Sequence, residues 1–461
     1  MTGKSIAVVA PPEPEGAYKD HNGMFGSHYD EGRVTRILDP DPLWAKLAQR
    51  SIDRYRDIEQ AAGISFYGET GYACIGAAEH SSYLSRVQRV AQDAGVDLMR
   101  LDAAQMHDAF PAMPSADVPQ QSELRALLQP TRAGHISPRQ MVKAQLQLCQ
   151  EQGGTVVRTH ATAVTVERRG SGDGDTMAIV HLAPTAPAAN KAADDSQPQQ
   201  VLRARKVLVA TGAFTTPALT DGVHVPLSVE GRTVVFANVT GLMQNQPELK
   251  LGSLPSVIKA LSRHDKRIEQ ANSATTQAAE DILEGKLGRQ QEGTEEQAQT
   301  PTFNADMNGD KEEVEEEEAK RDQGPLYDLY CLPPIKYPDG QWYIKIGTGD
   351  FPNKLPTLEH VLEWFRGPPA GPDVAMLTKE LHALYPCLES CEKTTTNCVL
   401  TYTAHGNPII DWARQDVLAV AVGGNGAAAK SADEIGRLAA AFVLGSPDDT
   451  YDMAAFKLPR H

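Results

Sequence analysis

Arginine and lysine side chains in two distant parts of this sequence are placed where they could bind an anion. Arg33 and Arg36 lie three residues apart in the segment FGSHYDEGRVTR. A guanidinium group binds a carboxylate through two parallel hydrogen bonds, so such a pair could hold an acidic ligand. Two solvated arginines on a loop are the alternative interpretation.

A glycine-rich turn near the C-terminus offers a second anion-binding feature. The apolar run 417–422 leads into Gly423-Gly424-Asn425-Gly426, and a helix that ends at Gly445 follows. Its apolar stripe consists of Ile435, Leu438, Ala439, Phe442 and Val443. A turn from a strand into a helix directs backbone N–H groups and the positive end of a helix dipole at an electron-rich group. Such turns are common in α/β proteins, so this one needs supporting features.

Cys398, Asp411 and Lys430 supply them. Cys398 lies thirteen residues before Asp411 of an Ile-Asp pair, and Lys430 follows the glycine turn. Together they resemble the C-terminal part of the monomeric sarcosine oxidase and N-methyl amino acid oxidase family, within the D-amino acid oxidase-like FAD oxidoreductases. The resemblance implies that Cys398 can bond the flavin, covalently or by contact alone, and that Lys430, just inside the helix, binds the substrate carboxylate together with Arg36.

Three further segments match the same family in the same order. Ser27, His28 and Arg33 match the segment that lies along the flavin, and Thr211 and Gly212, in VLVATGAF, match its second flavin-binding segment. Lys345, in the alternating run QWYIKIGTG, matches the lysine that faces the flavin and promotes its reaction with oxygen. A fixed positive charge beside reduced flavin favours superoxide formation. Without the match, a lysine on such a strand would be expected to face solvent.

The N-terminus departs from the family pattern. The apolar run 5–9 matches the second strand of the family, so the G-x-G-x-x-G turn that binds the FAD pyrophosphate has no counterpart here. The acid expected to bind the ribose falls on Ala10, with Glu13 nearby as a substitute. We expect either a truncated or isoform product, or a pyrophosphate held in another way.

The resemblance implies a flavoenzyme that oxidises the C–N bond of a small N-methyl, cyclic or primary amino acid to an imine. Oxygen would then reoxidise the FAD and yield hydrogen peroxide. One alternative is a flavin dehydrogenase that uses another electron acceptor. The other is a non-catalytic relative that lacks FAD and acts as an interaction protein.

The elements that must position these residues have local signals of their own. Asp39 or Asp41 is expected to cap a helix that starts at Pro42 and ends before Gly63, and its buried stripe comprises Trp44, Leu47, Ala48, Ile52, Tyr55 and Ala62. Ser137 and Pro138 start another helix. Residues 64–75 indicate a β-hairpin and 155–167 a β-rich run. Residues 325–349 end in an alternating strand, QWYIKIGTG, and 356–365 and 373–384 indicate helices.

Length and composition favour a protein of two domains. The chain has 461 residues, 41% of them hydrophobic, and a net charge of −16, which argues against nucleic acids and anionic membranes as partners. Its six cysteines are too few for a disulfide framework, and Cys387-x3-Cys391 is more typical of isolated thiols than of a metal site. No signal peptide or membrane-spanning run is found, so we expect a soluble, cytoplasmic monomer.

We expect an α/β protein, α+β overall, in which an incomplete Rossmann-like FAD-binding domain is interleaved with an antiparallel-sheet substrate domain. The acidic, polar segment 263–323 is expected to be a disordered insertion, either a passive loop or a site for protein docking. The domain boundaries that we predict are 1–75, 135–220 and 395–461 for FAD binding, and 76–134 and 221–394 for the substrate.

Overall fold

The structure is a computed structural model, and it describes residues 5–13, 24–77, 80–114, 124–168, 176–183, 200–261, 327–349, 353–446 and 448–460. The predicted insertion at 263–323 lies outside these residues.

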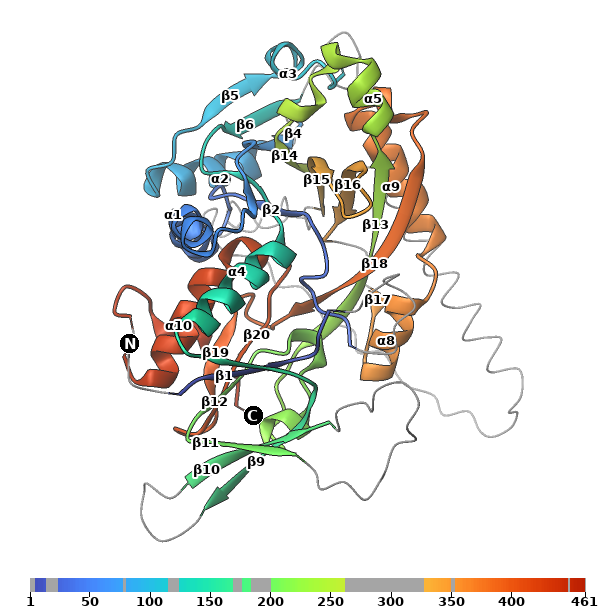
Figure 1. The fold of residues 1–461 in the computed structure, drawn as a ribbon. Coiled ribbons are helices and arrows are strands. Elements are labelled where there is room, and N and C mark those ends of the chain that lie inside the picture. Colours follow the sequence, from blue (N-terminus) through green and yellow to red (C-terminus); the bar gives the residue numbers. More distant parts are fainter. Residues whose placement is uncertain are drawn as a thin grey trace, which may run out of the picture.

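The α-helices gather along the edges of the molecule (Figure 1). They are α1 (Pro42–Ala62), α2 (Ser81–Asp93), α3 (Ala103–Ala109), α4 (Pro138–Glu151), α5 (Thr240–Asn245), α8 (Leu358–Arg366), α9 (Gly371–Leu384) and α10 (Ala432–Leu444). Short 3-10 helices include η2 (Gly212–Phe214), η3 (Pro217–Thr220), η4 (Pro247–Leu249), η5 (Leu251–Ser253), η6 (Pro386–Leu388), η7 (Ala429–Ser431) and η8 (Met453–Phe456).

The largest sheet has nine strands, in the order β17-β13-β16-β15-β14-β4-β6-β5, with β18 also paired to β13. Its members are β4 (Tyr72–Gly76), β5 (Met99–Asp102), β6 (Arg125–Gln129), β13 (Ser228–Asn238), β14 (Ser256–Leu261), β15 (Tyr327–Lys336), β16 (Trp342–Thr348), β17 (Asn353–Lys354) and β18 (Lys393–Tyr402). All its pairings are antiparallel except that of β14 with β4. One face packs on α9 through a core that includes Val235, Ile344, Ile346, Leu377 and Leu381.

Smaller sheets form the lower part of the molecule in Figure 1 and its junction with the large sheet. Their strands are β1 (Ala7–Ala10), β2 (Arg33–Thr35), β3 (Tyr67–Gly68), β7 (Gly134–Ile136), β8 (Thr155–Arg158), β9 (Ala161–Arg168), β10 (Thr176–Leu182), β11 (Val201–Ala204), β12 (Val207–Val209), β19 (Ile409–Arg414) and β20 (Leu418–Val422). The pairs β1–β8 and β12–β20 are parallel. Parallel pairs beside a large antiparallel sheet confirm the predicted α/β, α+β architecture.

The helices with complete local signals form as predicted. Asp41 caps α1 by accepting hydrogen bonds from Leu43 N and Trp44 N, and Gly63 ends the helix in the left-handed conformation. Ser137 caps α4 through Gln140 N, and Gly445 ends α10 with φ of 74°. Caps and apolar periodicity are local properties, so the sequence alone is enough to predict these helices.

Two predictions about local structure are wrong. Residues 64–75 do not form a hairpin, because β3 pairs with β7 in one sheet and β4 pairs with β6 and β14 in another. Gly71, with φ of 82°, is where the chain passes between the sheets, and its N–H donates to Ala133 O. Lys430 is not inside α10: it lies in η7, just before that helix.

Candidate functional site

Arg36 and Lys430, 394 positions apart in the sequence, meet at a single oxygen atom. Arg36 Nη1 lies 2.9 Å from Asp39 Oδ2, and Lys430 Nζ lies 2.7 Å from the same atom. Arg36 is 9% exposed, Lys430 3% and Asp39 5%, so water is almost excluded from this contact. Two cations thus bind one buried carboxylate, which belongs to the chain itself. We call these three residues the Asp39 cluster.

Neighbouring elements hold the Asp39 cluster in place. The loop between β2 and α1 is fixed because Ile37 N and Leu38 N both donate to Gln129 Oε1. The hydroxyl of Tyr55, on α1, donates to Lys430 O at 2.7 Å and so fixes η7 against that helix. The Lys430 ammonium lies 5.8 Å from the centre of the Trp44 ring.

Burial and mutual attraction act in opposite directions on these charges. Burial alone would raise the pKa of Asp39, but Lys430 and Arg36 hold that pKa at about 2. Burial lowers the pKa of Lys430 to about 8, although Asp39 opposes the shift. The carboxyl is therefore ionised at neutral pH, and the lysine is protonated there but close to its titration range.

Lys345 and Arg33 form a similar arrangement around Asp30. Lys345 is 2% exposed, and its ammonium binds Asp30 Oδ2 and Gly32 O, the latter at 2.9 Å. Arg33 pairs with the same Asp30 oxygen, while the hydroxyl of Tyr337 donates to Asp30 Oδ1 at 2.8 Å. We call Lys345, Arg33 and Asp30 the Asp30 cluster. Burial lowers the pKa of Lys345 to about 8, assisted by Arg33 and opposed by Asp30.

Cys398 belongs to the same region as Lys345. On β18 it pairs with Arg232 of β13, and Lys345 on β16 pairs with Phe236 of the same strand. Arg232 and Phe236 are four positions apart on one strand, so all these side chains lie on one face of the sheet, opposite the α9 core. Burial raises the pKa of the Cys398 thiol, while Arg33 and Lys345 counteract the shift. The structure thus brings Cys398, Lys345 and Arg33 together.

Strand β2 connects the two clusters. Arg33 begins β2 and Arg36 follows its last residue, Thr35. At about 3.3 Å per residue, the two arginine backbones are about 10 Å apart. Each cluster contains two cations and one carboxylate, so each has a net charge of +1 from its own members. Two buried positive sites whose backbones are about 10 Å apart could contact different parts of one ligand.

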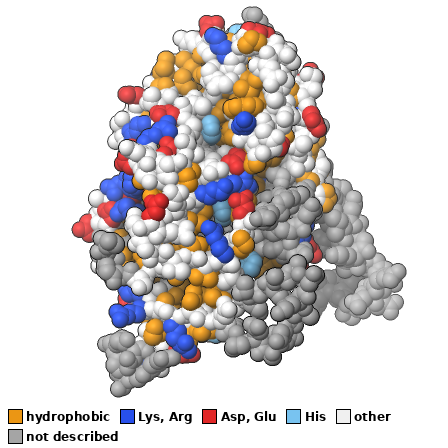
Figure 2. All heavy atoms as spheres, viewed as in Figure 1, with side chains coloured by type: hydrophobic (Ala, Val, Ile, Leu, Met, Phe, Trp, Pro, Cys, Tyr) orange, Lys and Arg blue, Asp and Glu red, His pale blue; other side chains and the backbone are white. Residues whose placement is uncertain are grey.

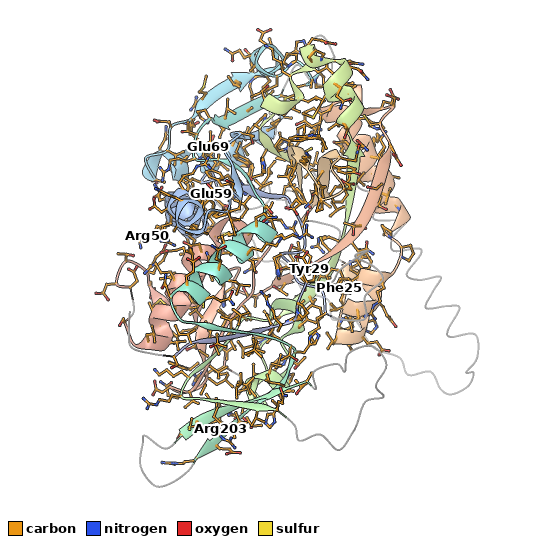
Figure 3. The ribbon with its side chains drawn as sticks, viewed as in Figure 1. Phe25, Tyr29, Arg50, Glu59, Glu69 and Arg203 are labelled. Carbon is orange, nitrogen blue, oxygen red and sulfur yellow. The ribbon has the colours of Figure 1, made fainter. Side chains whose placement is uncertain are left out.

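The two predicted flavin-side segments lie close to each other and to β18. Phe25 stacks on Phe365 of α8 at 4.4 Å between ring centres, and Phe214 of η2 and Val399 belong to the same apolar cluster. Figure 3 shows Phe25 and Tyr29 near the centre of the molecule. This packing places Phe25 and Phe214 beside β18 at Val399, the residue after Cys398.

Individual residues of these segments contribute in different ways. Ser27 O accepts a hydrogen bond from Arg33 Nη2 at 3.1 Å, and burial lowers the pKa of His28. Thr211 Oγ1 contacts Thr215 Oγ1 at 2.9 Å. Gly212 has φ of 53°, and a Cβ placed there would meet no atom within 4 Å, so the backbone at this point is open to a neighbour.

The glycine turn is bound mainly to β18. Gly424 N donates to Thr401 Oγ1 at 3.2 Å and Asn425 N donates to Thr401 O at 2.7 Å. Asn425 Oδ1 accepts from Thr403 N at 2.9 Å. Two of the turn's N–H groups are therefore satisfied by the protein, in contrast to the prediction that the turn directs free N–H groups at a cofactor. Its role in the structure is to hold η7 and Lys430 against β18.

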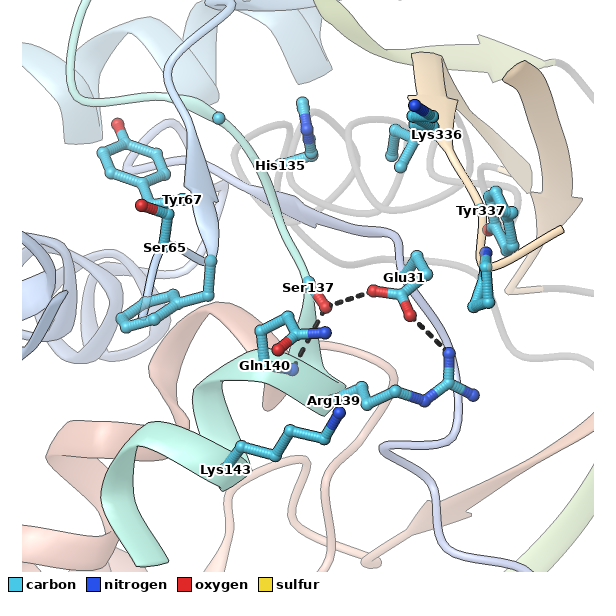
Figure 4. Close-up of a pocket in the computed structure, with 14 residues that line it drawn as sticks. Glu31, Ser65, Tyr67, His135, Ser137, Arg139, Gln140, Lys143, Lys336 and Tyr337 are labelled. Atoms are coloured by element: carbon cyan, nitrogen blue, oxygen red, sulfur yellow. Dashed lines mark hydrogen bonds and ion pairs between the residues drawn. The ribbon is translucent and has the colours of Figure 1, made fainter. Parts of the chain in front are cut away.

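A cavity of about 640 Å³ lies beside the Asp30 cluster (Figure 4). Its lining includes Tyr337, which binds Asp30, and Glu31, which pairs with Arg139 and accepts from Ser137 Oγ at 2.6 Å. The Tyr67 hydroxyl and His135 Nδ1, both on lining residues, have no hydrogen-bond partner among the described residues. The volume is within the usual range for small-molecule sites. Figure 2 shows basic and acidic side chains interspersed over the middle of this face.

The sequence did not reveal the cavity or the two acids that pair with the cations, Asp30 and Asp39. Asp39 was one of two candidates for a helix cap, and Asp30 was not considered. A signal was present, because Asp30 lies three residues before Arg33 and Asp39 lies three residues after Arg36. Glu13, the predicted ribose acid, pairs instead with Arg139.

The sequence matches the family of FAD dependent oxidoreductases over residues 2–264. This match covers more than half of the chain, so the protein belongs to that family. The curated proteins gave no match. Within the described residues, no helix is long and apolar enough to cross a membrane.

Solved structures of two oxidases and a dehydrogenase share the fold at low sequence identity. Iminodiacetate oxidase from Chelativorans sp. BNC1 has a TM-score of 0.61 at 13% identity, covering 99% of this chain and 93% of that chain. NikD, an amino acid oxidase of nikkomycin biosynthesis, has a TM-score of 0.61 at 14% identity, covering 99% of this chain and 91% of that chain. L-Proline dehydrogenase from P. horikoshii has a TM-score of 0.58 at 14% identity, and the match covers 90% of this chain and 82% of that chain. These likenesses confirm the fold.

The residues present are compatible with the flavin end of FAD. The cavity beside Tyr337 has room for an aromatic ring system, and Tyr337 in its lining donates to Asp30, which also binds Lys345. The open backbone at Gly212 is a second point of close approach.

Proposed function

We propose that the protein is an FAD-dependent oxidase that converts the C–N bond of a small N-methyl, cyclic or primary amino acid to an imine and passes the electrons to oxygen. The observation that carries the proposal is the convergence of Arg36 and Lys430 on one carboxylate oxygen, because a carboxylate is the group that all these substrates share. The fold likeness to iminodiacetate oxidase and NikD supports the reaction class.

Each residue of the site has a role in this proposal. Arg36 and Lys430 bind the substrate carboxylate and so orient the amine-bearing carbon, which lowers the entropic cost of reaction. The cofactor is supported by Ser27, His28, Arg33, Cys398, Thr211 and Gly212. The turn 423–426 acts indirectly, by holding η7 and Lys430 against β18. FAD, when bound, supplies the two-electron redox chemistry. Lys345 maintains a positive charge beside it, and Cys398 is the candidate for a covalent link.

The predicted pairing of an FAD-binding domain with a substrate domain is part of the same proposal. Both cation clusters lie at β2, where the smaller sheets join the nine-stranded sheet. A ligand held there would contact both of the predicted domains.

The experiment that tests the proposal is a visible spectrum of the purified protein, before and after acid precipitation, followed by turnover with sarcosine, pipecolate, glycine and proline. A yellow pellet indicates attached flavin, and a yellow supernatant indicates flavin bound without a covalent link. Peroxide release under air supports an oxidase. A colourless protein that also fails to take up added FAD contradicts the proposal and favours the non-catalytic interaction protein.

A dehydrogenase is the second candidate, and the fold likeness to L-proline dehydrogenase favours it. Reduction of an artificial dye by the same substrates, without oxygen consumption, would identify this activity.

A further inference from the structure

We propose that Asp39 is an internal competitor of the substrate: its carboxylate occupies the position that the substrate carboxylate takes on Arg36 and Lys430, and substrate binding displaces it. This inference rests on the proposed function, because it concerns the same cation pair. Asp39 then determines how strongly Arg36 and Lys430 bind a carboxylate, and which carboxylates they bind.

The first argument is chemical identity. Asp39 Oδ2 receives the bonds of both cations, at 2.9 Å from Arg36 Nη1 and 2.7 Å from Lys430 Nζ. The Asp39 carboxylate is the same functional group as that of an amino acid. A guanidinium and an ammonium arranged to bind one such group are arranged to bind the other.

The second argument is charge. A buried link between chain segments needs only one cation and one anion, whereas the Asp39 cluster contains a second cation, and all three residues are at most 9% exposed. If Asp39 moved away, both buried cations would lose the carboxylate that they share, which is costly unless another anion takes its place. Asp328, on β15, also acts on Arg36 electrostatically: burial raises the pKa of this carboxyl, and Arg36 opposes the shift.

The third argument is which part can move. The backbone of the loop is fixed, because Ile37 N and Leu38 N donate to Gln129 Oε1 and both side chains are at most 1% exposed. Lys430 is fixed through its carbonyl, which binds Tyr55. The Asp39 side chain is held by its oxygens alone, through the two cations and Asp41 N at 3.1 Å. Rotation of this one side chain would free the cation pair without movement of the backbone.

The test is chemical rescue of Asp39→Ala by acetate in the full-length protein. Removing the side chain leaves a space for one small carboxylate between Arg36 and Lys430. We expect acetate to raise the midpoint of thermal unfolding of Asp39→Ala at concentrations about tenfold lower than those that affect the wild type. Potassium chloride at equal ionic strength should not do so. Trp44 fluorescence is a second readout, because its ring lies 5.8 Å from the Lys430 ammonium.

Matched variants make the outcomes distinguishable. Asp39→Ala/Lys430→Met should lose the acetate effect, and Asp53→Ala, at an acid that pairs with Arg132 on the surface, should behave like the wild type. If Asp39→Ala does not fold, Asp39→Asn retains the shape of the side chain and should also bind acetate more tightly than the wild type.

If acetate stabilises the wild type and Asp39→Ala equally, and Lys430→Met abolishes both effects, a carboxylate binds beside Asp39. The inference is then overturned and the proposed function stands. If acetate affects none of the variants, Arg36 and Lys430 are not a carboxylate site, and both the inference and their role in the proposed function fail. The flavin spectrum still tests the redox function separately.

Discussion

At the scale of single residues, Lys345 is the side chain whose burial differs most from what its position in the sequence predicts. A lysine on an alternating strand usually faces solvent, but this one is 2% exposed and is held by Asp30 and Gly32. In Lys345→Met we expect reoxidation of reduced flavin by oxygen to slow about a hundredfold, because a fixed charge beside the reacting centre is lost. Stopped-flow measurement of reoxidation tests this expectation. Lys457→Met, which changes an exposed lysine, should leave the rate unchanged.

The same lysine predicts a pH dependence. Its pKa is about 8, so the side chain is charged below that value and loses its charge as the pH rises through it. The rate of reoxidation should therefore fall above about pH 8, and the fall should be absent in Lys345→Met. A wild-type rate that stays constant from pH 6 to 10 would exclude a role for the Lys345 charge in this step.

Lys430 is expected to act on substrate binding. Lys430→Met should raise KM for the amino acid substrate about tenfold or more, because one of two charge-assisted hydrogen bonds to the carboxylate is removed. The flavin spectrum should be retained. Steady-state kinetics with the substrate identified in the turnover screen would measure the change, and an unaltered KM would argue that the carboxylate binds elsewhere.

At the scale of elements, the turn 423–426 allows a matched comparison. Gly423 and Gly426 have φ of 85° and 70°, but a Cβ at Gly423 would lie 2.3 Å from Thr403 Cγ2, whereas at Gly426 the nearest atom is 3.6 Å away. Gly426→Ala should lower the free energy of unfolding by about 1 kcal/mol, from backbone strain. Gly423→Ala should lower it by about 3 kcal/mol, because the clash adds to the strain. Urea unfolding measures both, and equal losses would show that the turn shifts away from β18.

Elements that depend on neighbouring residues could be predicted from the sequence, and contacts between residues far apart in the chain could not. The cap of α1 at Asp41 and the end of α10 at Gly445 depend on neighbouring residues only. The supposed hairpin at 64–75 failed because β3 and β4 find their partners at 134–136, 125–129 and 256–259. For the same reason, the cations of the candidate site were recognised in the sequence, whereas their partners Asp30 and Asp39 were not.

At the scale of the whole molecule, the Asp39 cluster connects the N-terminal and C-terminal parts of the chain, and this makes stability sensitive to acid. In the unfolded chain the Asp39 carboxyl has its ordinary pKa of 3.8, whereas in the folded protein the pKa is about 2. Its contribution, about 2 kcal/mol, is therefore present above pH 4 and is lost as the pH falls towards 2.

Asp39→Asn should remove this part of the pH dependence, and urea unfolding between pH 2 and 7 would show a flatter curve than for the wild type. Asp53→Asn, at an exposed acid, is the control and should retain the wild-type slope. If Asp39→Asn and the wild type lose stability in parallel, other carboxyl groups account for the acid sensitivity.

The position of Lys430 in the sequence also determines when the Asp39 cluster can form during synthesis. Arg36 and Asp39 are synthesised close together and can pair with each other at once, but Lys430 follows Asp39 by 391 residues. Until then Tyr55 and the buried face of α1 also lack η7 and α10, their partners in the finished protein. The cation pair is thus completed only after Lys430 has been synthesised and η7 has packed against α1.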